Sequence, residues 1–198
     1  MSQRSYPMTL AETASIFAET LVRSALFEQA RSAEERQAIA WAEADGAATF
    51  LVNIPARFDF EQALVAEREQ GYVSSARLKA LTDEAWGRWY EKSLGRYHPM
   101  FWAAKAHFSI AGFGFYNYPY LFGYLFSLGV YQQLMSRKGA GEANVAEAYR
   151  ALLRDTGRMS AEDLVAKHLG QDIREAAFWQ GSLALVAAAV DRFEQTQS

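Results

Sequence analysis

Residues 7–26 read PMTLAETASIFAETLVRSAL, and the spacing of the apolar side chains in this stretch indicates the fold. The large apolar side chains recur at the spacing of an amphipathic helix. They are Leu10, Ile16, Phe17, Leu21 and Leu26. Similar spacing continues along almost all of the chain, and no stretch alternates as a half-buried strand does. We therefore predict an all-α fold, an irregular multi-helix domain that takes in residues 1–198 as a single helical domain.

Composition narrows the classes of protein to consider. The chain has 198 residues, of which 51% are hydrophobic and 22% charged, enough for a substantial core and too apolar for disorder. The net charge is −3 and both signs are interleaved, so neither a nucleic-acid-binding stripe nor a polybasic membrane anchor is expected. The absence of cysteine excludes disulfides, thiolate metal sites and cysteine nucleophiles.

Two features bear on cellular location. The N-terminus MSQRSYPM has no apolar segment of the kind found in a signal peptide. The longest weakly charged run, Phe108–Met135, is interrupted by glycines, a proline and tyrosines, so we expect it to be buried in protein and not in a membrane. A cytoplasmic protein is the expectation.

Capping and breaking residues divide the chain into about seven to nine helices. Ser32 with Glu35 forms a capping-box pattern that opens a long helix with a kink near Pro55. Ser75, Ser160 and Asp172 are further expected N-caps. The later helices are expected over residues 57–70, 119–137, 142–154, 161–169 and 173–193, with a helix after Ser75 whose apolar face carries Leu78, Leu81, Trp86 and Trp89.

A short helical stretch carrying Phe101, Trp102 and His107 is followed by glycines at 112 and 114. These glycines predict a loop before Pro119. Five tyrosines lie in or just after this loop, at positions 116, 118, 120, 124 and 131. Each buried hydroxyl needs a hydrogen-bond partner, so the tyrosines either line a wet groove or pack into the core with local partners.

The usual catalytic motifs are missing. The three histidines, at 98, 107 and 168, never occur four residues apart, so a complete zinc site is not expected within this chain. There is no serine in a GxSxG elbow and no glycine-rich phosphate loop. The remaining candidates are two carboxylates near the N-terminus and the segment from His107 to Tyr131.

The carboxylate of Glu12 has two interpretations. In one, Thr9 caps a helix and Glu12 completes the capping box; in the other, Glu12 is one ligand of a metal site. Glu19 follows two helical turns later on the same face, as a solvated residue or as one partly buried by its apolar neighbours.

Two segments resemble a known family. YPMTLAETASIFAETLV is similar to the segment that follows the zinc-binding helix in oligoendopeptidase F and thimet oligopeptidase, and HFSIAGFGFYNYPYLFGYLFSLGVY resembles their substrate-binding segment. In these zinc metallopeptidases an HExxH helix supplies two histidine ligands and the catalytic glutamate, and a later helix supplies a glutamate as third ligand.

The resemblance implies a role for each candidate residue. Glu12 is the metal ligand and Glu19 orients a zinc-bound histidine. His107, Tyr118 and Tyr124 are the catalytic groups that hydrogen-bond the scissile carbonyl, since a phenol stays protonated at neutral pH. Tyr116 and Tyr120 bind substrate, or replace the other two tyrosines as the donor.

HExxH itself is absent from this sequence. The resemblance therefore implies the C-terminal part of a zincin-like oligopeptidase catalytic domain, which cleaves short peptides only with zinc and with the N-terminal part that carries HExxH. Alone, the chain is expected to be inactive and to self-associate through the surface that is left uncovered. The alternatives are a non-catalytic helical peptide-binding or scaffold module, and a folded fragment with no independent role.

Overall fold

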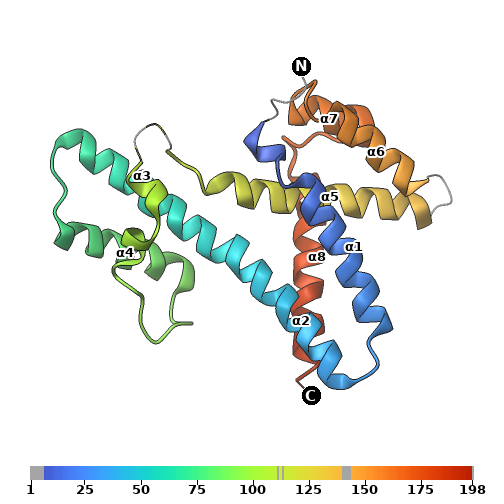
Figure 1. Cartoon of the computed structure of the whole chain (residues 1–198), viewed down its shortest axis with the longest axis horizontal. Helices are drawn as coiled ribbons and strands as arrows, with labels where there is room; N and C mark the ends of the chain where they lie inside the picture. The colour runs from blue at the N-terminus through green and yellow to red at the C-terminus, as the bar shows by residue number, and fades with distance from the viewer. Residues whose placement is uncertain (1–6, 111, 113, 140–143, 198) are drawn as a thin grey trace. The chain divides into compact units, whose positions relative to one another are not determined.

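The computed structural model describes residues 7–110, 112, 114–139 and 144–197. These residues form helices and turns and contain no strand, which confirms the all-α prediction. The elements are η2 (Met8–Leu10), α1 (Thr13–Gln29), α2 (Ala33–Ala48), η3 (Thr49–Asn53), α3 (Ile54–Gln70), α4 (Ser75–Tyr90), η4 (Phe101–Ala104), η5 (Ala106–Phe108), α5 (Tyr118–Gly139), α6 (Val145–Asp155), α7 (Ala161–Leu169) and α8 (Ala176–Gln195) (Figure 1). Within the described residues, no helix is long and apolar enough to cross a membrane.

The contacts divide the chain into two compact units. The first unit combines Met1–Gly46 with Phe122–Ser198, and the second is Ala47–Leu121. The single helical domain expected over residues 1–198 stays a prediction. Each unit is described on its own below.

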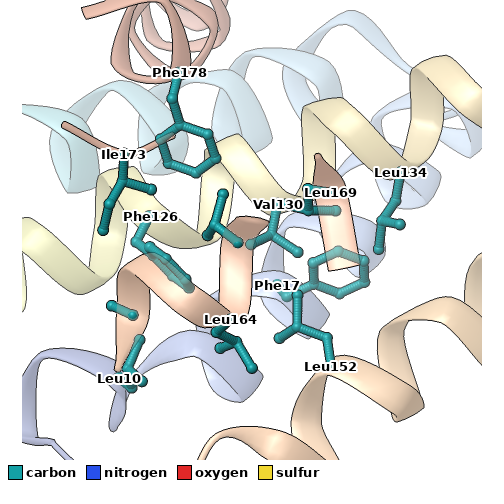
Figure 2. Packing of buried hydrophobic residues seen from close by; sticks show 12 residues of the cluster. Leu10, Phe17, Phe126, Val130, Leu134, Leu152, Leu164, Leu169, Ile173 and Phe178 are labelled. Atoms are coloured by element: carbon teal, nitrogen blue, oxygen red, sulfur yellow. The ribbon is translucent and has the colours of Figure 1, made fainter. Parts of the chain in front are cut away.

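The core of the first unit is built around one face of α5. Phe122, Phe126, Val130 and Leu134 recur every four residues along this helix, which places them on one face. Phe126 and Val130 are fully buried. Side chains from η2, α1, α6, α7 and α8 pack against this face (Figure 2). The buried partners include Leu10, Phe17, Leu152, Leu164, Leu169, Ile173 and Phe178.

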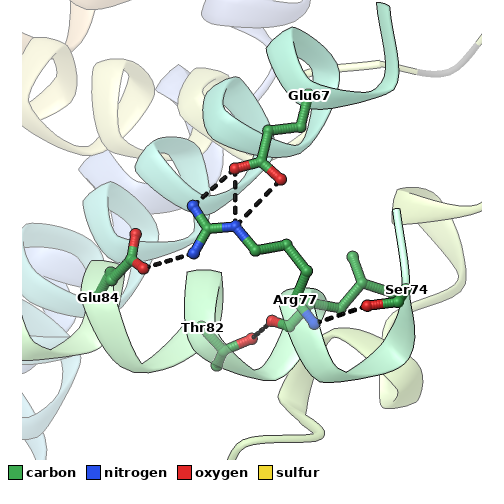
Figure 3. A network of polar contacts seen from close by, with 6 residues as sticks. Glu67, Ser74, Arg77, Thr82 and Glu84 are labelled. Atoms are coloured by element: carbon green, nitrogen blue, oxygen red, sulfur yellow. Dashed lines mark hydrogen bonds and ion pairs between the residues drawn. The ribbon is translucent and has the colours of Figure 1, made fainter. Parts of the chain in front are cut away.

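In the second unit, α3 and α4 pack against each other through a smaller apolar cluster. Phe60 and Leu64 of α3 meet Leu81 and Trp86 of α4 in this cluster. Polar contacts bridge the same two helices on the surface, where the Arg77 guanidinium binds the carboxylates of Glu67 and Glu84 (Figure 3). The apolar cluster excludes water, whereas the ion pairs remain exposed to it.

The expected kink near Pro55 is present as a π-helical turn. Residues Thr49–Asn53 have π-helical hydrogen bonding, and α3 follows directly with Pro55 at its N-terminus. Proline has no N–H to donate and its ring crowds the carbonyl four residues earlier, so the regular α-helical pattern cannot pass through this position. A wider turn accommodates the proline without breaking the helix.

Two of the expected caps are confirmed. The backbone N–H of Glu35 donates to the Ser32 hydroxyl over 3.1 Å, and its carboxylate accepts from the N–H of Arg31 over 2.8 Å. The hydroxyl of Ser160 accepts from the N–H of Asp163 at the start of α7. These contacts satisfy N–H groups that a helix N-terminus leaves without a partner.

Other boundaries differ from the prediction. The cap of α4 is Ser74 and not Ser75, since the Ser74 hydroxyl accepts from the N–H of Arg77. Asp172 does not cap a helix: its carboxylate accepts from the N–H of Arg174, two residues on, which closes a turn before α8 begins at Ala176.

The starts of α6 and α5 and the exposure of Trp89 also differ from the prediction or lie outside the described residues. The predicted helix start at Glu142 lies outside the described residues, and α6 begins at Val145 after an Asn144 cap. Pro119 is the second residue of α5. Trp89 is 40% exposed rather than part of the apolar face, and its indole N–H donates to Asp59.

Candidate active site

Glu12 lies in the turn between η2 and α1, directly before Thr13. Its half-buried side chain makes no capping hydrogen bond, and its carboxylate accepts instead from the Ser15 hydroxyl over 2.8 Å. Thr9 lies inside η2. The capping box between Thr9 and Glu12 is therefore wrong, because the tight turn of η2 occupies the residues that would have formed the first turn of the helix.

The turn that carries Glu12 is held against α5. A Cβ atom on Gly123 would lie 3.3 Å from Glu12 Cβ, so glycine permits a close approach at this point. The Ser127 hydroxyl donates to the carbonyl of Thr13 over 3.1 Å, and the Tyr149 hydroxyl donates to the carbonyl of Ala14 over 3.2 Å. These contacts fix the position of the Glu12 backbone within the first unit.

Two other candidates of the first unit lie on α1 and α5. The Glu19 side chain is 57% exposed and pairs with Arg23, one helical turn on. Tyr124 is 7% exposed, and burial followed by the nearby Glu43 carboxylate raises its pKa to about 12. Tyr131 packs against the core, with its ring 5.8 Å from that of Phe17. For Tyr124 and Tyr131, the core-packing interpretation of the tyrosines describes the structure.

The second unit brings His107 close to two of the tyrosines. The ring centroid of His107 is 5.7 Å from that of Tyr116, and the Tyr120 hydroxyl donates to the Tyr116 hydroxyl over 2.5 Å. Tyr118 faces elsewhere: it is 45% exposed, and its ring lies 5.9 Å from that of Phe58. Tyr116 thus lies beside His107, and Tyr120 is bonded to Tyr116; these are the two tyrosines to which the resemblance gave a role in substrate binding.

A buried polar network lies next to His107. The Nε2 atom of His107 is 2.7 Å from the side-chain nitrogen of Asn117, whose oxygen accepts from Arg57 over 3.3 Å. Burial, followed by the positive charges of Arg57 and Lys105, lowers the pKa of His107. These effects favour the neutral form of the imidazole.

Glu61 joins this network from α3, one helical turn after Arg57. It is 4% exposed, and its Oε1 accepts from the backbone N–H of Phe115 over 2.5 Å. A side-chain hydrogen bond to Asn117 adds to this contact, while burial raises the pKa of the carboxyl. The other carboxylate oxygen and the Nε of Arg57 are buried without a hydrogen-bond partner.

Sequence reasoning missed Arg57, Glu61 and Asn117. A weak signal was available, because Ala56, Phe60 and Leu64 recur every four residues and mark the buried face of α3. Arg57 and Glu61 each directly follow a residue of that face, which places both charges at its border.

The described residues contain no complete metal site. Among them, no group of three or more histidine, cysteine, aspartate or glutamate side chains is placed to do so. Glu12 offers one carboxylate, whereas a catalytic zinc site needs three protein ligands. His168 already binds Asp155, with 2.9 Å between Nε2 and Oδ2. The described part of the chain therefore does not by itself fit a zinc ion.

Comparison with known proteins identifies the family. The sequence model of peptidase family M3 matches residues 1–184, so the chain belongs to this family, whose members are metallopeptidases. The fold is similar to the crystal structure of a candidate peptidase from Chlamydophila abortus, with a TM-score of 0.79 and 20% sequence identity. That similarity covers 97% of this chain and 31% of the other, so the chain spans about a third of the length of its structural relative. No curated protein matches the sequence.

Proposed function

We propose that this chain is the C-terminal part of the catalytic domain of a zinc metalloendopeptidase that cleaves short peptides, similar to oligoendopeptidase F. The observation that carries the proposal is the family match over residues 1–184. Glu12 supports it from within the first unit, because its half-buried carboxylate contacts a hydroxyl and does not cap the helix. A carboxylate in that setting remains available as a ligand.

In the proposal, Glu12 contributes one ligand to the zinc ion, and the HExxH-bearing part of the enzyme contributes the others. Zinc, when bound, would polarise the peptide carbonyl and activate a water molecule. Gly123, Ser127 and Tyr149 hold the Glu12 turn on α5, and this would limit the positions that the carboxylate can reach. Glu19 is the proposed partner of a zinc-bound histidine, and in the described chain it pairs with Arg23.

His107 and a tyrosine are the proposed donors to the oxyanion. Among the candidate tyrosines of the second unit, Tyr118 is the most exposed, at 45%, and this suits contact with a peptide. Tyr116 and Tyr120 are proposed to bind substrate, since their hydroxyls are bonded to each other beside His107. Tyr124 is the alternative donor, and its burial keeps its phenol protonated well above neutral pH.

The test uses the chain combined with the HExxH-bearing part, in cis or in trans. Glu12→Gln should lose most of the zinc at limiting metal, because a neutral amide is a weaker ligand than a carboxylate. Tyr118→Phe should keep the zinc and lower kcat by roughly 10²–10³, with little change in KM. Tyr72→Phe is the matched control, because Tyr72 is 93% exposed in the same unit.

The outcomes separate the candidate roles. If Tyr116→Phe, Tyr120→Phe or Tyr124→Phe lowers kcat and Tyr118→Phe does not, another phenol is the donor. If the combined protein binds peptides but never cleaves them, the chain is a helical peptide-binding module and the peptidase proposal fails.

A further inference from the structure

We propose that Asn117 is a positioning residue that holds His107 as a neutral imidazole with its proton on Nδ1. His107 then acts as a fixed hydrogen-bond donor and not as a proton carrier. The donor role rests on the proposed peptidase function, whereas the state of the ring can be tested without it.

The orientation of the Asn117 amide follows from its partners. Arg57 Nη1 lies 3.3 Å from the side-chain oxygen of Asn117, and a guanidinium can only donate hydrogen bonds. Turning the amide over would place its NH₂ group against that cation. Arg57 therefore requires the oxygen to face it and the NH₂ group to face away from it.

The amide orientation determines the state of the imidazole. The Asn117 nitrogen lies 2.7 Å from His107 Nε2, so Nε2 must present its lone pair to an N–H donor. A protonated Nε2 would set two donors against each other at that distance. The ring proton therefore belongs on Nδ1, and protonation of Nε2 would break the contact.

Burial makes this arrangement rigid. Asn117 is 2% exposed and Glu61 is 4% exposed, so water cannot replace their partners. The same Glu61 carboxylate accepts from the N–H of Phe115, which has a left-handed backbone conformation with φ of 54°. Glu61 thus fixes the backbone of the loop that carries Tyr116 and Asn117.

The charges around His107 favour the neutral ring. Arg57 and Glu61 face this cluster from α3, and Lys105 and Tyr116 lie on the segments on either side of His107. The cations Arg57 and Lys105 oppose protonation and act together with burial to lower the pKa of His107. The Glu61 carboxylate accepts from the N–H of Phe115. The electrostatics therefore agree with the geometry.

This state has a consequence for the proposed reaction. A neutral ring with the proton on Nδ1 offers an N–H to a carbonyl oxygen and keeps it there over the physiological pH range. The ring would need no change in protonation during turnover. His107 would thus stabilise charge, as a phenol does, and would not act as a general acid.

The test is nuclear magnetic resonance of the isolated chain with ¹⁵N-labelled histidine. Long-range correlations show which ring nitrogen carries the proton, and the loss of signals in His107→Gln identifies His107 among the three histidines. We expect the proton on Nδ1 and a titration midpoint below the usual value of about 6.5. A proton on Nε2, or a midpoint at or above about 6.5, would overturn the proposal.

Two substitutions at Asn117 test whether this residue determines the protonation state of the His107 ring. In Asn117→Asp the carboxylate would accept from Nε2–H, so the proton should move to Nε2 and the midpoint should rise by about one pH unit or more. Asn117→Ala should give a smaller rise in the titration midpoint of His107. This variant can be measured if the aspartate variant does not fold. Asn53→Ala is the matched control, because its amide donates to the Tyr90 hydroxyl in the same unit. Unchanged His107 signals in both folded Asn117 variants would refute the role of Asn117.

A second measurement separates this inference from the proposed function. In the chain combined with the HExxH-bearing part, Asn117→Asp should lower kcat and should make kcat fall further at acidic pH. The zinc content should be unchanged. If the resonance results hold while His107→Ala retains full turnover, the assigned state of the ring stands and the catalytic role of His107 fails. If His107→Ala is inactive but the wild-type ring carries its proton on Nε2, the catalytic role stands and the inference fails.

Discussion

At Gly129 of α5, any side chain would collide with α8. A Cβ atom there would lie 2.5 Å from Phe178 Cζ and 2.9 Å from the Ser182 hydroxyl oxygen. Phe178 is 2% exposed and has no open space to move into. Gly129→Ala should therefore destabilise the first unit by about 1–3 kcal/mol, measured as a lower midpoint in urea denaturation.

Gly46→Ala is the control for this prediction. Gly46 lies within α2, and a Cβ atom there would have no atom within 4 Å. The loss of backbone freedom in the unfolded chain should then stabilise the protein by about 0.4–1 kcal/mol. Equal effects of the two substitutions would mean that α5 and α8 do not approach as closely as described.

Asp155 makes the first unit sensitive to acid. Its carboxylate accepts from Lys167 Nζ over 2.5 Å and from His168 Nε2 over 2.9 Å, and these bonds lower its pKa to about 2. A carboxyl whose pKa is lower in the folded state stabilises the fold above its unfolded pKa, and this contribution disappears as the pH falls through the folded value. The difference in Tm between wild type and Asp155→Asn should be full at pH 5 and should shrink between about pH 4 and pH 2.

Asp191→Asn is the matched comparison for Asp155, because it removes an exposed carboxylate of α8. This variant should follow the wild-type Tm at every pH in that range. A difference between wild type and Asp155→Asn that stays constant down to pH 2 would contradict the assigned bonds.

Individual site residues differ in how far the sequence could reveal them. Glu12 and His107 stand out in the sequence because the segments that carry them resemble a known family. Each residue is also unusual among its neighbours in the sequence. Arg57, Glu61 and Asn117 were missed, since the network they form depends on contacts between residues as far apart as 57 and 117. Tertiary burial of a charge leaves little trace in helical periodicity.

At the scale of helices, substitutions in α3 and α4 allow apolar and ionic contributions to the stability of the second unit to be compared. Phe60 is 1% exposed and packs edge-to-face on Phe108, so Phe60→Ala should cost about 3–5 kcal/mol of the second unit's stability. Arg77 is 41% exposed, and its ion pairs with Glu67 of α3 and with Glu84 of α4 are open to solvent. Arg77→Met should change the urea midpoint far less, and 1 M salt should remove most of its effect. A larger loss for Arg77→Met than for Phe60→Ala would contradict this ranking.

The ends of helices show where local sequence suffices. Ser32 and Ser160 were predicted because a hydroxyl followed three residues later by an N–H partner is a local pattern. The prediction that Asp172 caps a helix was wrong because the same side chain can also close a turn with Arg174. Whether it caps a helix or closes a turn depends on how α8 packs. The helices themselves followed from periodicity, since burial of one face imposes it.

At the scale of the whole chain, the division into two units was not visible in the sequence. The boundary after Gly46 falls within α2, and the one after Leu121 falls within α5. Neither helix has the flexible, polar linker that usually separates domains. The division depends on which neighbouring helices pack against each part of α2 and α5. The apolar periodicity is the same on both sides of each boundary and therefore does not reveal it.

The last prediction concerns zinc binding by the chain on its own. Glu12 supplies a single carboxylate, and among the described residues no cluster adds two more ligands. Since a catalytic zinc site requires three protein ligands, the isolated chain should bind Zn²⁺ weakly and should not hydrolyse peptides. Competition with a chelating dye should give the same weak affinity for wild type and Glu12→Gln. Stoichiometric zinc bound with submicromolar affinity, or peptidase activity that a chelator removes and zinc restores, would show that this chain carries a complete site.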